Sequence, residues 1–188
     1  MSAPPDLPAV VARAHALSRQ RGFVSSCRNE TGRLLASLAA SRTGTLAESG
    51  TGCGVGSAWL RSGMREGSKL VTVERDAGLV EAVREIFADD QSVTVLEADW
   101  TELAPYGPFS LLFLDVREAK RAGPDTVADL VEPGGFVVLD DFTPCATWPP
   151  MFQGRVDTMR QVWLTDPRFT TVEVMVAFDA SVLIATRR

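Results

Sequence analysis

Two sets of residues in this chain of 188 amino acids have types and spacings suited to ligand binding. The first is the run Glu48–Gly56, in which glycine recurs at every second position before a helix-like segment. Glycines in such a turn let the backbone approach a ligand closely, and the helix directs its free N–H groups at the turn. Glu74 ends the next apolar run, about where doubly wound folds place a carboxylate on a ribose. This pairing predicts a nucleoside-cofactor site; the alternative is a tight turn with a solvated carboxylate.

The second set consists of acidic residues that end or directly follow apolar segments. They are Glu48, Glu74, Asp99, Asp115 and Asp140. In open α/β sheets, ligands bind beyond the carboxyl ends of the strands, where the strand order reverses. If each apolar segment is a strand of one parallel sheet, the five acids converge on one rim.

Five segments are predicted to be strands, with helical segments between them. The strands are Thr45–Glu48, Lys69–Glu74, Ser92–Leu96, Ser110–Asp115 and Gly135–Asp140. The helices are Ser57–Arg65, Ala77–Ala88, Trp100–Ala104 and Asp125–Val131. Segments such as Leu111–Leu114 are apolar throughout, which is typical of strands with helices on both faces. The alternation predicts a doubly wound α/β fold.

The C-terminal part departs from this alternation. Arg155–Leu164 has a helical pattern, whereas Thr170–Phe178 and Ser181–Thr186 are β-rich runs separated by Asp179 and Ala180. So short a link permits only an antiparallel hairpin. We therefore expect a mostly parallel, seven-stranded sheet that ends in an antiparallel hairpin.

Composition excludes several classes of protein. The net charge is −5, and no cluster of Lys and Arg is evident in the sequence, so we expect no nucleic-acid partner. No apolar stretch is long enough to cross a bilayer, and the N-terminus lacks a secretory signal. Cys27, Cys53 and Cys145 are widely spaced, which favours reduced thiols in the cytoplasm over disulfides or a zinc site.

The chain resembles the class I S-adenosylmethionine-dependent methyltransferases, most closely the cation-dependent O-methyltransferase branch that includes catechol O-methyltransferase. The motifs that carry the resemblance are Glu48-x-Gly50-Thr51-x-x-Gly54, Val73-Glu74, Glu97–Trp100, Leu112–Asp115 and Glu132–Asp141. The resemblance implies a Rossmann-like methyltransferase fold as a single domain over residues 1–188. Its N-terminal helices and a cofactor and substrate lid would span 1–43, with the polar segment Ser25–Thr31 closing over the cofactor, and its α/β core would span 44–188.

The resemblance also implies that S-adenosylmethionine lies along the carboxyl ends of the strands. Glu74 would accept hydrogen bonds from the ribose hydroxyls, and Asp99 would hold the adenine amino group or, alternatively, cap a helix. The implied cofactor-binding set is Glu48, Gly50, Thr51, Gly52, Gly54, Ser57, Glu74, Arg75, Ala98, Asp99, Trp100 and Asp115.

Asp115, Asp140 and Asp141 match positions at which this branch holds a divalent cation beside the acceptor hydroxyl. Oxygen ligands suit Mg²⁺ or Ca²⁺ better than zinc, and adjacent aspartates repel each other unless a cation neutralises them. The alternative is that these acids cap helices or end strands in solvent. The lysine that serves as base in relatives is not at the expected spacing, although Lys120 can reach the site. Asp115 and Lys120 are therefore the candidate catalytic residues.

The expected function is O-methyl transfer to a small, catechol-like hydroxylated substrate; a homodimer is compatible with the sequence. Three alternatives stay open. A nicotinamide-dependent oxidoreductase is disfavoured because the glycines do not form G-x-G-x-x-G in register. A methyltransferase acting on nucleic acid or an exocyclic nitrogen often has an Asn/Asp-Pro-Pro-aromatic motif, where this chain has Asp115-Val116-Arg117-Glu118. The third is a protein that binds the cofactor but has lost the chemistry.

Overall fold

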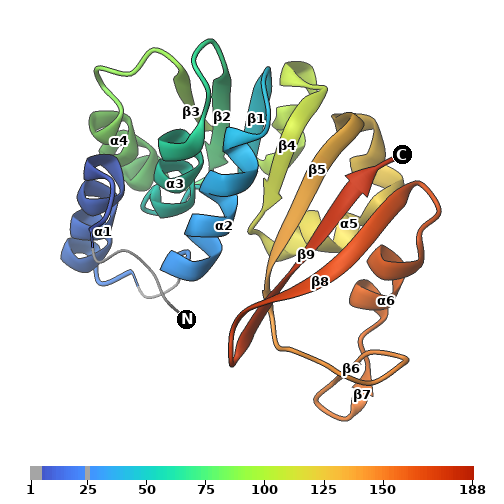
Figure 1. Ribbon diagram of the computed structural model, residues 1–188. Helices are drawn as coiled ribbons and strands as arrows, with labels where there is room; N and C mark the ends of the chain where they lie inside the picture. The colour runs from blue at the N-terminus through green and yellow to red at the C-terminus, as the bar shows by residue number, and fades with distance from the viewer. Residues whose placement is uncertain (1–5, 24–25) are drawn as a thin grey trace.

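A seven-stranded sheet forms the centre of the computed structural model, which describes residues 6–23 and 26–188 (Figure 1). The strand order is β3-β2-β1-β4-β5-β9-β8. Strands β1 to β5 are parallel, whereas β9 runs antiparallel to both β5 and β8. The strands are β1 (Thr45–Ser49), β2 (Lys69–Glu74), β3 (Val93–Glu97), β4 (Phe109–Leu114), β5 (Val131–Phe142), β8 (Phe169–Ala177) and β9 (Ala180–Arg187). The predicted doubly wound sheet with its terminal hairpin is confirmed.

Helices cover both faces of this sheet (Figure 1). The first face carries α1 (Ala9–Arg21), α2 (Asn29–Ala40), α3 (Val55–Gly63) and α4 (Ala77–Ile86). The second carries the short 3₁₀ helices η1 (Trp100–Tyr106) and η2 (Ala128–Leu130) together with α5 (Arg117–Val127) and α6 (Thr158–Thr165). A separate small hairpin of β6 (Met151–Phe152) and β7 (Arg155–Val156) precedes α6. Among the described residues, no helix is both long and apolar enough to span a membrane.

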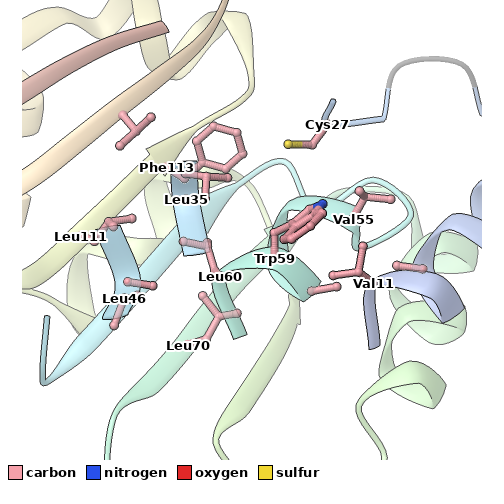
Figure 2. Packing of buried hydrophobic residues seen from close by; sticks show 14 of the residues in the cluster. Val11, Cys27, Leu35, Leu46, Val55, Trp59, Leu60, Leu70, Leu111 and Phe113 are labelled. Atoms are coloured by element: carbon pink, nitrogen blue, oxygen red, sulfur yellow. The ribbon is translucent and has the colours of Figure 1, made fainter. Parts of the chain in front are cut away.

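The parallel strands contribute side chains to two separate hydrophobic cores, because successive residues of a strand point to opposite faces. In β1, Leu46 packs on the first face and Ala47 on the second. Figure 2 shows the first core, where Leu46, Leu70 and Leu111 from three neighbouring strands meet Trp59 and Leu60 of α3. These strands are therefore apolar on both faces, in agreement with the continuous apolar segments that predicted them.

Two glycines allow α2 and α3 to pack closely. A Cβ at Gly32 would collide with the Trp59 ring, and one at Gly63 would collide with the backbone of Ala36. Because protein interiors are close-packed, neither position has space for an added methyl group. The contact therefore fixes α2 over α3.

Two predicted helices differ from the structure. The short helix expected over Asp125–Val131 begins earlier, at Arg117, and is interrupted at Gly123, whose φ of 75° is non-helical. Its first turns are polar and show no apolar stripe to reveal them. The helix expected over Arg155–Leu164 begins at Thr158, because Arg155 and Val156 pair with β6 instead. Ser25, part of the predicted lid, lies outside the described residues.

The strand order reverses at β1, which pairs with β2 on one side and with β4 on the other. Both neighbours are parallel to it, so the carboxyl ends of these strands share one edge of the sheet. The crevice at such a reversal is where ligands bind in doubly wound folds.

Candidate active site

The turn Gly50–Gly54, hereafter the glycine turn, follows β1 and is fixed by its own backbone. The N–H groups of Gly50 and Thr51 both donate to the carbonyl of Val73, each at 3.0 Å. Gly50 has φ 91° and Gly52 has φ 52°, values that favour glycine over any residue with a Cβ. A Cβ at Gly50 would also lie 2.6 Å from Val116 Cγ1. At its glycines, the turn therefore exposes backbone atoms where other residues would place a side chain.

Glu48 lies beneath this turn and is buried. Its carboxylate accepts hydrogen bonds from the hydroxyls of Ser57 and Thr72. Burial raises the pKa of Glu48 to about 8, although these two hydrogen bonds oppose the shift. The completely buried Ser57 thus acts on Glu48 and does not itself line a cavity in the described structure.

Glu74 ends β2 directly beside the glycine turn. Its Oε2 accepts from the Gly52 N–H at 3.0 Å, and its Oε1 accepts from the N–H groups of Arg75 and Asp76 at 2.8 and 3.1 Å. A carboxylate offers about four lone-pair sites, of which three are used here. Glu74 is therefore held in one orientation with room for about one further hydroxyl donor.

Two small cavities meet at Glu74 and Gly50. The turn cavity, about 180 Å³, lies against the glycine turn and is also lined by Phe23, Cys27 and Asp115. The strand-end cavity, about 70 Å³, lies beyond β2 and β3. Every residue of the sequence-derived cofactor set lines one of the two, except Ser57 and Gly54. Gly54 instead begins α3, where a Cβ would meet Val83 at 3.0 Å.

Asp99 has the helix-capping role that was the alternative expected from the sequence. Its Oδ1 accepts from the N–H and the hydroxyl of Thr101, at 3.2 and 3.0 Å, and so caps η1. The same side chain lines the strand-end cavity together with Ala98 and Trp100, while Arg75 lies 3.7 Å from its Oδ2. Capping is thus confirmed, and the adenine-binding role of Asp99 stays a prediction.

Asp115, Asp140 and Asp141, the acidic trio, come together where β4 and β5 end. Carboxylate oxygens of the three lie within 4.8 Å of one another. Neighbouring residues of a regular strand point to opposite faces, but the register of β5 shifts between Leu139 and Phe142, and Asp141 has φ 66°. This irregularity lets two adjacent aspartates serve one site.

Burial is the main influence on the protonation of Asp115 and Asp140. It raises the pKa of Asp115 to about 7, with a further rise from the neighbouring carboxylates and an opposing effect of Lys120. Burial also raises the pKa of Asp140. These two carboxyl groups are therefore costly to ionise without a positive charge nearby.

Lys120 reaches the acidic trio despite its unexpected spacing in the sequence. Its Nζ donates to the carbonyl of Asp140 at 2.9 Å and to Asp141 Oδ2 at 3.3 Å. The early start of α5 brings Lys120 into this position. From the first face of the sheet, Thr31 of α2 donates to Asp140 Oδ1 at 3.2 Å. The trio is therefore tied to both N-terminal and C-terminal elements.

A much larger cavity, about 1210 Å³, opens on the other side of the acidic trio. It lies between α5, α6 and the β6–β7 hairpin, and Phe142, Phe152 and Met159 contribute to its lining. Asp115 and Asp141 line both this cavity and the turn cavity. Trp148, between β5 and the hairpin, is 64% exposed and does not line it.

Several site residues were not identified from the sequence. Phe23 stands at the turn cavity, Thr31 at Asp140, and Arg117, Arg121 and Arg155 at the large cavity. The two arginines of α5 are four residues apart, which is a detectable spacing once the helix is recognised. No short sequence motif indicates that Arg155 lies near either of them.

Comparison with known proteins places this site in a family. The family described as "Methyltransferase domain" matches residues 47–142, which contain the glycine turn, Glu74 and the whole acidic trio. The chain therefore belongs to the methyltransferase-domain family. Among curated proteins, none matches the chain in sequence.

Solved structures with low sequence identity share the fold along nearly the whole chain. A methyltransferase from Geobacter sulfurreducens is 21% identical over 98% of this chain and 90% of its own, with a TM-score of 0.75. The O-methyltransferase TomG from Streptomyces achromogenes, solved with S-adenosylmethionine, is 20% identical over 97% and 92%, with a TM-score of 0.76. An O-methyltransferase from Bacillus cereus, solved with S-adenosylhomocysteine, is 17% identical over 97% and 93%, with a TM-score of 0.73. The fold is that of the class I S-adenosylmethionine-dependent methyltransferases.

Proposed function

We propose that this protein is an O-methyltransferase that moves a methyl group from S-adenosylmethionine to a hydroxyl of a small acceptor, assisted by a divalent cation. The observation that carries the proposal is the position of the acidic trio. Asp115 and Asp141 line both the turn cavity and the large cavity, so donor and acceptor would meet beside the carboxylates. We expect the reaction to take place in the cytoplasm.

The residues present fit the methyl donor. The glycine turn offers a backbone surface that a Cβ at Gly52 would narrow, since it would lie 3.1 Å from the Phe23 ring. Glu74 retains an acceptor site toward the junction of the two small cavities, which suits a ribose hydroxyl. Ala98 and Trp100 line the strand-end cavity, where a planar base would find apolar contacts. When bound, S-adenosylmethionine supplies a sulfonium methyl group that an oxygen nucleophile takes in line.

The acidic trio fits a hard divalent cation such as Mg²⁺. Three carboxylates and no nitrogen or sulfur ligand form the donor set, and Asp141 is exposed enough to leave room for water. Such a cation, when bound, lowers the pKa of a nearby acceptor hydroxyl. Lys120 is a positioning residue in this arrangement, because its Nζ holds Asp141 Oδ2 and the Asp140 carbonyl.

Without a cation in the acidic trio, Asp115 is the candidate acceptor of the hydroxyl proton, since burial raises its pKa to about 7. A bound cation would keep the Asp115 carboxylate ionised as a ligand, and the acceptor hydroxyl would then release its proton to solvent. The oxygen–carbon bond forms as the sulfur–carbon bond breaks, and the products are a methyl ether, S-adenosylhomocysteine and a proton. The unexpected sequence spacing of Lys120 was one reason to consider a protein that has lost the chemistry. Its Nζ contacts Asp140 and Asp141, and this supports an active enzyme.

Calorimetry with S-adenosylhomocysteine tests the donor site. Glu74→Ala is expected to weaken binding at least tenfold, which is about 1.4 kcal/mol, because the ribose loses its acceptor. Glu97→Ala is the matched control, since Glu97 pairs with Glu74 across β2 and β3 but lines no cavity among the described residues. If Glu74→Ala and the wild type bind S-adenosylhomocysteine equally tightly, Glu74 is not part of the donor site.

A methyl-transfer assay with catechol tests the reaction and the cation. We expect product only when a divalent cation is present, and loss of product when it is chelated. Asp141→Asn retains one oxygen ligand but removes a charge, so the Mg²⁺ concentration needed for half-maximal rate should rise about tenfold. Asp89→Asn, at an exposed acid remote from the trio, should behave as the wild type. Full turnover in a chelator would overturn the cation role.

A further inference from the structure

Cationic side chains dominate the part of the large cavity that lies beyond the acidic trio. Five line it, namely Arg117, Lys120, Arg121, Arg155 and Arg160. This is unexpected for a chain with a net charge of −5, and no basic cluster is visible in the sequence. The fold creates the cluster by bringing α5, α6 and the β6–β7 hairpin together.

Two of the five cations are neutralised within the protein. Lys120 is held by Asp141, as described above. Arg160 is buried, with its guanidinium 3.2 Å from both Asp157 and Glu173, and it also donates to the carbonyl of Thr143 at 2.8 Å. These two residues build the cavity wall and are not available to a ligand.

The remaining three, Arg117, Arg121 and Arg155, form what we call the basic wall. All three are exposed, and none of their guanidinium groups has a hydrogen bond or ion pair with any residue that the structure describes. Other exposed arginines differ in this respect, since Arg28 pairs with Asp179, whereas Arg65 is also unpaired in the described structure but lies outside the cavity. The basic wall therefore offers a set of unpaired guanidinium groups around one cavity.

The three arginines approach the cavity from two directions. Arg117 and Arg121 are four residues apart on α5, so they lie on one face of that helix, one turn apart. Arg155 belongs to β7, in the hairpin that Figure 1 places beyond the end of α6. Three cations around a shared space repel one another, and an oxyanion between them relieves this repulsion.

We propose that the methyl acceptor is itself an anion: its hydroxyl lies at the acidic trio, while a carboxylate or phosphate group binds the basic wall. Guanidinium groups match these oxyanions with paired hydrogen bonds, which provide orientation as well as affinity. The cavity volume of about 1210 Å³ leaves room for an acceptor larger than a single ring. The inference rests on the proposed function and adds the charge of the substrate to it.

Three catechols of the same ring and different charge provide the test: dihydroxybenzoate, its neutral amide, and dihydroxybenzylphosphonate. Each is titrated by calorimetry into the protein saturated with S-adenosylhomocysteine and Mg²⁺, and kcat/KM is measured with S-adenosylmethionine. We expect the wild type to prefer an anionic ligand over the amide by at least tenfold. The carboxylate and phosphonate arms then identify which oxyanion the wall prefers.

The arginines are replaced one at a time. Arg121→Gln and Arg155→Gln should each lower the preference for the anion about fivefold or more, and raised salt should weaken it in the wild type. Arg65→Gln is the control, because Arg65 is also exposed but lies outside the three cavities. Thermal melting confirms that each variant is folded.

Equal binding of the benzoate, the phosphonate and the amide by the wild type would overturn the proposal, as would arginine variants that behave like Arg65→Gln. Binding needs no turnover, so the two proposals fail separately. A charge preference without methyl transfer would refute the O-methyltransferase function and leave the anion site in place. Methyl transfer without a charge preference would refute the anion site and leave the O-methyltransferase function in place.

Discussion

The donor and acceptor halves of the site are built in different ways. On the donor side, the glycine turn and Glu74 are fixed by backbone hydrogen bonds, and the cavities there are about 180 and 70 Å³. On the acceptor side, one cavity of about 1210 Å³ is lined by side chains from α5, α6 and a small hairpin. The donor half is tightly specified by the main chain, whereas the acceptor half depends on exposed side chains that can change without altering the fold.

The two halves should therefore tolerate substitutions to different degrees. A change beneath the glycine turn should disturb folding, since close-packed interiors accept little extra volume. A change in the β6–β7 hairpin should alter only which acceptor binds. Three substitutions, taken in order of decreasing effect, test whether the two halves differ in this way.

The largest effect is expected from Gly56→Ala. The added Cβ would collide with Glu48 Oε1 and lie 3.0 Å from the Phe113 ring, so the variant should lose about 3 kcal/mol of unfolding free energy. Gly78→Ala is the control, because a Cβ there would meet only Asp76 Oδ1, at 3.2 Å. Urea denaturation measures both. A Gly56 variant as stable as the control would show that the donor half has more freedom than its packing implies.

A smaller effect should follow from Glu48→Gln. The pKa of Glu48 is about 8 in the folded protein and 4.5 when unperturbed, so between these values the folded state binds a proton that the unfolded state releases. The unfolding free energy contributed by this group therefore falls as pH rises, by about 2 kcal/mol between pH 6 and pH 8.

Glutamine resembles the protonated carboxyl and does not titrate, so the variant should lack this part of the pH dependence. Denaturation midpoints at several pH values measure it. Parallel profiles for the wild type and Glu48→Gln would mean that Glu48 is ionised within the folded protein near neutral pH.

The smallest effect is expected from Phe152→Ala in the β6–β7 hairpin. Phe152 is 48% exposed and lines the large cavity, so its loss should raise the KM for the acceptor about threefold, or about 0.6 kcal/mol. The affinity for S-adenosylhomocysteine should stay the same. Phe178→Ala is the control, at a residue that is 91% exposed and lines none of the three cavities. A weakened donor site would show that the halves are coupled.

The donor half was largely predictable because its signals are local. The glycine turn and Glu74 are 20 to 24 residues apart along the chain, and the apolar segments before them predict two parallel strands that end at one sheet edge. What sequence could not reveal was that Ser57 faces Glu48 beneath the turn. The side a hydroxyl faces depends on how α3 packs, which no short motif encodes.

The acceptor half was less predictable because distant segments create it. The start of α5 at Arg117 was missed, since its first turns lack an apolar stripe, and this hid the position of Lys120. The strand pairing of Arg155 was missed because a two-residue strand has no periodicity. Cavity walls assembled from such elements become visible only in three dimensions.

The orientation of Glu74 has a consequence for the thermodynamics of binding. Three backbone N–H groups hold this carboxylate before any ligand arrives, so its rotamer freedom is already lost in the free protein. A sugar hydroxyl that meets it incurs no further entropy loss at this side chain, and most of the enthalpy of the new bond is retained. Folding therefore already includes the entropy cost of ordering the Glu74 side chain. A flexible glutamate would instead add this cost to the free energy of each binding event.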